Sequence, residues 1–211
     1  MTIKKEISHS NRGFSIIEMV VAMTIILIAL GLVSTLFARA LSVRKRESSR
    51  TDALTAAQAA LNVMSREVAN SGFGLAGNGI VYADSNLFQL HMTTNTTNTN
   101  KVITDVGEDV TFFYEPASKS ILRYDRNGGG PGVAQTSVLI NRVSSVNFQY
   151  FDYVGSSSAV TVVNPPTINT GRVRITLLVQ LEQVTHQANP SNVTLVSDVT
   201  LRNSSYMLRQ Y

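Results

Sequence analysis

The chain has 211 residues, which suffices for one long element and one domain with a sizeable core. It contains no cysteine, so a disulfide framework and a thiolate metal site are excluded. About half of the net charge of +4 belongs to residues 1–13, and the next basic residues form one cluster between Arg39 and Arg50. No nucleic-acid-binding motif accompanies this cluster, so we expect no specific nucleic-acid binding.

The first part of the chain reads as a short leader followed by a membrane-length helix. Residues 1–13 are polar and basic, and the positive-inside rule predicts that they stay in the cytoplasm. Residues 19–38 carry no charge and would form about 30 Å of helix, which matches a bilayer core. A secretory signal peptide fits poorly, because the apolar run is too long and no small-x-small cleavage site follows.

One acid, Glu18, stands at the start of this apolar run. A carboxylate is costly to bury in a membrane and asks for a functional explanation. In a plain single-pass anchor, which remains an alternative, Glu18 would reach the membrane interface.

The residues around this acid carry a resemblance to a known family. The stretch reads Gly13-Phe14-Ser15-Ile16-Ile17-Glu18. It resembles the class III signal of type IV prepilins and type II secretion pseudopilins: a basic leader ending in Gly, then Phe, then Glu at the fifth mature position, then about twenty apolar residues.

The resemblance implies a role for three residues. A prepilin peptidase would cut between Gly13 and Phe14 and methylate the new amine of Phe14. Gly13 would leave the backbone unobstructed at the cut. Glu18 would pair with the Phe14 amine of a neighbouring subunit, which offsets the cost of burying the acid and sets the register between helices. The chain departs from many major pilins because its helix has no Pro, and only Gly31 interrupts it, so partial unwinding is less assured.

A second amphipathic stretch continues the helix over residues 39–72. Apolar side chains recur there at helical spacing. They are Leu54, Ala57, Leu61, Met64 and Val68. The pattern predicts one helix from Phe14 to about Asn70, with Gly72 and the following glycines ending it.

The end of this helix carries a finer resemblance. Arg66-Glu67 followed by Gly72-Phe73-Gly74 is similar to the helix-to-loop region of PilW-type minor pilins and J-type minor pseudopilins. It favours these two groups within the family.

Residues 73–211 show alternating runs separated by turn residues, which is typical of a β-rich domain. Strands are expected near residues 88–92, 110–114, 120–124, 146–153, 172–181 and 193–201. Residues 93–100 are only Thr and Asn and are expected to form a polar loop with no reason to be buried. The fold class is therefore α+β, with a long N-terminal helix packed on an antiparallel β-sheet domain.

The chain offers no combination of residues for catalysis, a cofactor or a metal. Its histidines are His9, His91 and His186, and no pair has ligand spacing. Asp105, Glu108 and Asp109 read as a solvated turn, because a calcium loop would need more oxygen ligands at regular spacing. No Gly-x-Ser-x-Gly motif is present. We therefore predict that the protein is not an enzyme.

Arg123 and Arg202 are expected at strand ends, as surface residues paired with a neighbouring carboxylate or as contacts to another subunit.

These observations favour a minor type IV pilin with four parts. They are a leader (residues 1–13), a transmembrane or filament-core helix (14–38), its amphipathic continuation (39–72) and a periplasmic head domain (73–211). The protein would sit in the bacterial inner membrane with its N-terminus cytoplasmic, and on the cell surface after pilus assembly.

The partners implied are prepilin peptidase, other major and minor pilins, inner-membrane lipid and the pilus or secretion assembly platform. The alternatives are a minor pseudopilin of a type II secretion system and an unprocessed single-pass anchored binding or sensor domain.

Overall fold

The computed structural model describes residues 13–81, 88–98, 100–153, 160–181 and 192–209. The chain divides into two compact units, Met1–Glu47 and Ser48–Tyr211, here called the first and second unit. Helix α1 (Ile16–Ala69) begins in the first unit and ends in the second. This single long helix was predicted from the sequence, and its ends lie close to the expected ones.

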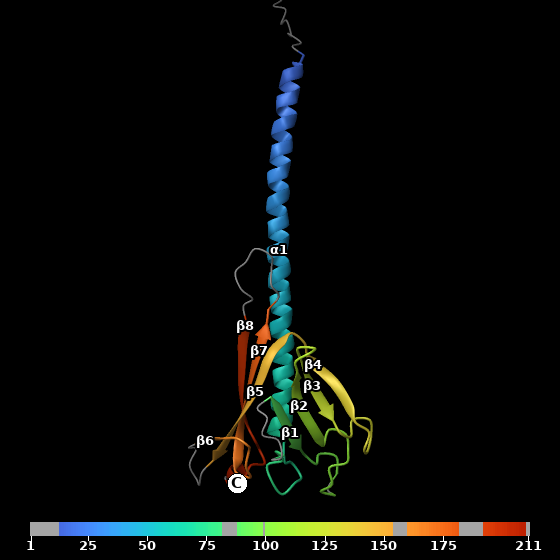
Figure 1. Cartoon of the computed structure of the whole chain (residues 1–211), viewed down its shortest axis with the longest axis vertical. Coiled ribbons are helices and arrows are strands. Elements are labelled where there is room, and N and C mark those ends of the chain that lie inside the picture. Colours follow the sequence, from blue (N-terminus) through green and yellow to red (C-terminus); the bar gives the residue numbers. More distant parts are fainter. Residues whose placement is uncertain (1–12, 82–87, 99, 154–159, 182–191, 210–211) are drawn as a thin grey trace, which may run out of the picture. The chain divides into compact units, whose positions relative to one another are not determined.

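The strands of the second unit form two four-stranded antiparallel sheets (Figure 1). The first sheet has the order β1-β2-β3-β4. Its strands are β1 (Gln89–Thr93), β2 (Asp109–Glu115), β3 (Ser120–Asp125) and β4 (Gln135–Ile140). The second sheet has the order β6-β5-β7-β8. Its strands are β5 (Val143–Tyr153), β6 (Val160–Val163), β7 (Thr170–Gln180) and β8 (Asn192–Thr200), and the short helix α2 (Ser205–Leu208) follows.

The end of α1 packs on these sheets and completes the core, so the expected α+β fold is confirmed. The buried side of the helix consists of Ala57, Ala60, Leu61, Met64 and Val68. Leu54, which the spacing included, is only half-buried, and Ala60 takes part instead. The alternation expected for residues 172–181 is also confirmed, since Val173, Ile175, Leu177 and Val179 are fully buried.

A glycine turn ends α1, as expected. Gly72 has φ +77°, and a Cβ there would lie 2.1 Å from the carbonyl oxygen of Gly77. Its N–H donates to the carbonyl oxygen of Thr93 at 2.9 Å. A side chain at this position would clash and strain the backbone, so glycine is required.

The prediction that residues 93–100 have no reason to be buried is wrong for Thr94 and Asn95, which are 6% and 1% exposed. The N–H of Asn95 donates to the carbonyl oxygen of Phe73 at 2.7 Å, and the Thr94 hydroxyl lies 3.3 Å from the carbonyl oxygen of Asn70. These polar side chains are buried because the turn after α1 leaves backbone groups that need partners.

The solvated turn expected at Asp105, Glu108 and Asp109 is also wrong for the last two, which are 0% and 4% exposed. The Glu108 carboxylate accepts hydrogen bonds from the N–H groups of Thr97 (3.2 Å) and Asp105 (3.1 Å). The buried Glu108 carboxylate therefore holds the connection between β1 and β2 together by accepting hydrogen bonds from its backbone. The sequence pattern does not reveal these donors.

Two strands, β4 and β6, were not anticipated. β4 is mostly exposed and β6 has four residues, so neither shows an apolar alternation long enough to be recognised.

Candidate functional site: the start of helix α1

The first turn of α1 is capped by the acid that the sequence singled out. Gly13, Phe14 and Ser15 precede the helix, and Ile16 is its first residue. The backbone N–H of Ser15 donates to Glu18 Oε2 at 3.1 Å. Ser followed three residues later by Glu has the spacing of a capping box, and a negative charge here also favours the helix dipole. Glu18 thus stabilises the start of its own helix in the single chain.

Apolar side chains surround this carboxylate and lie open to the outside. Phe14 is 91% exposed and Ile16 is 84% exposed. A shallow open groove beside the acid is lined by Phe14, Ile17, Glu18, Val21, Ala22 and Ile25. Apolar surface of this extent is stable only when lipid or other protein covers it.

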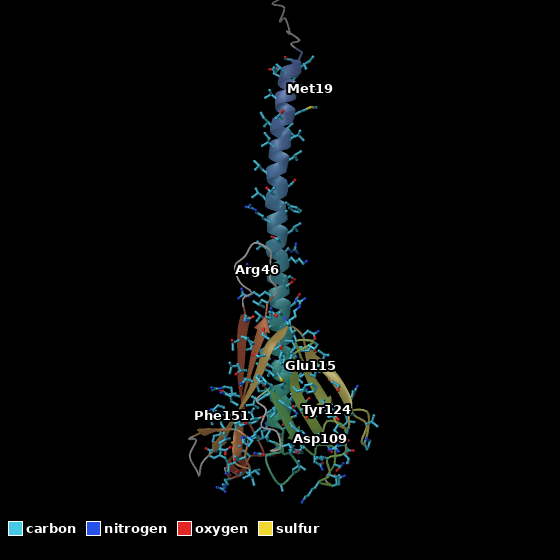
Figure 2. All side chains as sticks on the ribbon, in the orientation of Figure 1. Met19, Arg46, Asp109, Glu115, Tyr124 and Phe151 are labelled. Atoms are coloured by element: carbon cyan, nitrogen blue, oxygen red, sulfur yellow. The ribbon has the colours of Figure 1, made fainter. Side chains whose placement is uncertain are left out.

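The first unit is long and apolar enough to cross a membrane. Its most apolar window has a mean hydropathy of 2.7, and none of that window is buried within the chain. Side chains project from the helix along this unit, Met19 among them (Figure 2). The apolar segment expected at residues 14–38 is therefore helical and presents its side chains outward on all sides.

Two hydroxyl groups inside this segment, those of Thr24 and Thr35, do not need water. The Thr24 hydroxyl donates to the carbonyl oxygen of Val20 at 2.7 Å, and that of Thr35 donates to Leu32 at 2.8 Å. Because the helix itself satisfies these groups, they add little to the cost of placing the segment in an apolar environment.

Gly13, the residue expected before the cut, is exposed, and a Cβ placed on it would meet nothing within 4 Å. The glycine is therefore not required by packing in the single chain.

Comparison with known families decides the class of this helix. Residues 8–34 match the family model described as the prokaryotic N-terminal methylation motif. The chain carries the N-terminal segment of the type IV prepilin and pseudopilin superfamily. No curated protein and no solved structure matches the chain.

The motif has direct consequences. It implies a pilin or pseudopilin that is processed by prepilin peptidase. Proteins of this superfamily are structural subunits and not enzymes. Together with the apolar helix, the motif is consistent with anchoring in the inner membrane before assembly.

Apart from His9, the other residues named from the sequence belong to the second unit. His91 Nε2 is 2.7 Å from Asp109 Oδ1, a pair that links β1 to β2, whereas His9 and His186 lie outside the described residues. Among the residues that the structure describes, no group of three His, Asp or Glu side chains could hold a metal ion.

The two arginines expected at strand ends differ in position and in hydrogen-bond partner. Arg202 follows β8, and its NH1 donates to Asn70 Oδ1 at 3.2 Å, so its partner is an amide and not a carboxylate. Arg123 lies inside β3 and not at its end, and its guanidinium contacts the carboxylates of Glu67 and Asp125. The pairing of Arg123 with a carboxylate was expected, and its inward-facing position was not.

Proposed function

We propose that the protein is a minor type IV pilin, a membrane-stored subunit that enters a pilus or the complex at its tip. The match of residues 8–34 to the N-terminal methylation motif is the observation that supports this proposal most strongly. Its work would be binding, in assemblies that serve motility, adhesion or DNA uptake.

Processing would occur between Gly13 and Phe14, followed by methylation of the Phe14 amine. The exposed position of both residues ahead of α1 supports this assignment, because a peptidase must reach an extended backbone. The cut would turn the N–H of Phe14 into a cationic amine at the start of an apolar helix. That amine cannot be buried alone without a large cost.

Glu18 would supply the counter-charge. In the single chain its carboxylate accepts one hydrogen bond, from the Ser15 N–H at 3.1 Å, which leaves acceptor capacity for a second donor. When helices pack together, the Phe14 amine of a neighbouring subunit would take that place. The pair would fix the axial register, because any other register leaves two unpaired charges in an apolar bundle.

The apolar surface of the first unit would serve twice, first against lipid and then against neighbouring pilin helices. Relative to exposure to water, covering each large side chain such as Leu or Ile, by lipid or by protein, contributes about 1.5–3 kcal/mol. The exchange of lipid for a neighbouring helix gains instead from close packing and from polar contacts. The head formed by the second unit would lie in the periplasm, and its surface would determine which major or minor pilins stand beside it. The assembly platform would act on the membrane-stored form.

A minor pseudopilin of a type II secretion system is the second candidate, because the methylation motif belongs to both groups. The Arg66-Glu67 pair and the Gly72-Phe73-Gly74 turn resemble PilW-type and J-type proteins alike. Deletion of the gene separates the two candidates: loss of pili with normal secretion favours the pilin, and the reverse favours the pseudopilin.

Mass spectrometry of the membrane protein tests the proposal itself. A mature chain that begins at N-methylated Phe14 is expected. A chain that retains Met1 and Gly13 would contradict the proposal and leave an unprocessed anchored binding or sensor domain.

A further inference from the structure

Strand β8 forms a long open edge of the second sheet (Figure 1). It pairs with β7 on one side in an unbroken register from Arg172↔Thr200 to Gln180↔Asn192. Within the part of the chain that the structure describes, no strand lies on its other side. An edge of this kind presents unpaired N–H and C=O groups that another strand can pair with.

The hydrogen bonds at the two ends of β7 define which residues face the open side. The N–H of Leu201 donates to the carbonyl oxygen of Gly171 at 2.8 Å. The N–H of Gln180 points away from β8, because it donates to the carbonyl oxygen of Arg142, the residue before β5, at 2.9 Å. Backbone groups alternate in direction along a strand. The β8 residues whose N–H and C=O point outward are therefore Asn192, Thr194, Val196, Asp198 and Thr200.

The side chains of these five residues are exposed as well. In the described structure, none of their backbone groups has a partner. The open edge thus offers five outward donors and five outward acceptors in a regular row.

In the part of the chain that the structure describes, β8 lacks the features by which proteins protect such an edge. It has no proline, no lysine and no bulge, and its sequence NVTLVSDVT is rich in β-branched residues. Its single charge, on Asp198, is paired with Arg174 of β7 at 2.8 and 2.9 Å.

The other edges are less available. β6 has four residues, and β1 forms a bridge with Ile80 outside the named strands. β4 is shorter than β8 and has a register shift next to Leu122. Among the described edges, β8 is the longest and the most regular.

We propose that β8 accepts an extended segment of another subunit of the same assembly, which adds a strand to the second sheet. Backbone hydrogen bonds would supply the attraction, and side chains opposite the outward row would supply selectivity. A β-branched residue fits opposite Val196, and a basic or hydroxyl residue fits opposite Asp198. That the partner is another subunit of the assembly depends on the proposed function. That β8 can accept a strand depends only on its unpaired backbone groups.

A second copy of this chain fits less well. Two β8 strands could pair antiparallel with Val196 opposite itself, and no like charges would meet. Such a pair reverses the direction of one copy relative to the other. Subunits that enter one filament from one membrane are oriented alike, so this antiparallel pair does not form within one filament, and we assign the strand to a different subunit.

A proline substitution on β8 can block strand addition at the open edge without changing the fold of the chain. Val196→Pro removes an N–H that has no partner in the described structure, and edge strands tolerate proline where the N–H faces outward. Val196→Thr is the matched control, since it keeps both the N–H and the β-branched shape. We expect the proline variant to be processed and folded like the parent but to co-purify with other subunits at a level at least about tenfold lower. Equal co-purification of both variants would overturn the proposal.

Hydrogen exchange in the unaltered protein gives an independent test. In the isolated full-length chain in detergent, the amides of Thr194, Val196 and Asp198 should exchange rapidly, and those of Leu195 and Ser197 slowly. In the purified assembly the first three should slow by about tenfold or more. Unchanged exchange would overturn the proposal, and so would protection that appears in the isolated chain as its concentration rises, because that outcome identifies a second copy.

The N-terminal residue of the parent protein distinguishes a failure of the proposed function from a failure of the inference about β8. If Phe14 is not the methylated first residue, the proposed function fails whatever happens at β8. If processing is normal and the edge amides stay unprotected in the assembly, only the inference about β8 fails.

Discussion

Arg123 of β3 donates from Nε to both carboxylate oxygens of Glu67 in α1, at 3.1 Å each. Its NH1 also donates to Asp125 Oδ2 at 3.1 Å, and the Asp125 side chain is only 2% exposed. One guanidinium therefore ties the last turns of the helix to the first sheet and compensates a buried carboxylate. Replacing one member of such an ion pair costs free energy of folding, because the other charge stays buried without a partner.

Arg123→Met is expected to destabilise the second unit by about 3 kcal/mol, since it keeps the apolar stem but leaves Asp125 without its cation. Urea unfolding followed by tyrosine fluorescence measures this, because the chain has no Trp and all of its 7 Tyr lie in the second unit. Arg174→Met is the matched control: it breaks an exposed pair and should have a much smaller effect. Equal losses for the two variants would contradict this account.

Asn78 lies where α1, the β6–β7 connection and the start of the first sheet meet. Its Nδ2 donates to the carbonyl oxygens of Thr167 (3.0 Å) and Thr170 (2.8 Å), and its Oδ1 accepts from the Ile80 N–H at 3.2 Å. The residue is 1% exposed. Asn78→Ala should cost about 2–4 kcal/mol, because several buried backbone groups lose their partner together.

Asn147 is the control for this variant. Its Oδ1 is buried and has no hydrogen-bond partner in the described structure. Asn147→Thr should therefore change the free energy of unfolding by less than about 0.5 kcal/mol, or stabilise the protein. A large loss for Asn147→Thr and none for Asn78→Ala would refute the assignment.

Two substitutions at Glu18 separate its capping role from its charge. Glu18→Gln keeps an acceptor for the Ser15 N–H, whereas Glu18→Ala removes both the cap and the charge. If pairing with a neighbouring amine drives assembly, both variants should be processed normally and both should be depleted in sheared pili by roughly tenfold or more. Normal incorporation of Glu18→Gln would show that the hydrogen bond, and not the charge, is what matters.

Gly13→Leu should leave the longer precursor in the membrane, because a side chain would obstruct the backbone at the proposed cut. Gly31→Leu is the matched control. A Cβ at either glycine meets nothing within 4 Å in the single chain, so neither change disturbs packing there. Immunoblots of membrane fractions distinguish precursor from mature chain, and normal processing of Gly13→Leu would disprove the cleavage assignment.

The pair between Arg174 and Asp198 predicts a pH effect. The hydrogen bond from the Arg174 guanidinium lowers the pKa of Asp198 below its ordinary value of about 3.9. A lowered pKa in the folded state contributes stability above the ordinary value, and that contribution is lost as the pH falls through the folded value. NMR titration of the Asp198 carboxyl should show the lowered pKa, and Arg174→Gln should raise it. An unchanged pKa in that variant would exclude Arg174 as the cause.

The sequence determined the parts whose physical signal is local. The uncharged apolar run of residues 19–38 and the helical spacing of residues 54–68 predicted the extent of α1, and alternation predicted the central strands β5 and β7, because each pattern lies within one element. The residues from Gly13 to Glu18 indicated the prepilin-type motif, since spacing along the chain defines that motif.

Only the tertiary structure decided the features that depend on distant segments. Thr94, Asn95 and Glu108 look like solvated polar residues, yet they are buried because backbone groups from other loops need partners. The open edge of β8 has the same origin. Its sequence alternates like that of an inner strand, and only the order of strands in the sheet leaves one side of its backbone unpaired.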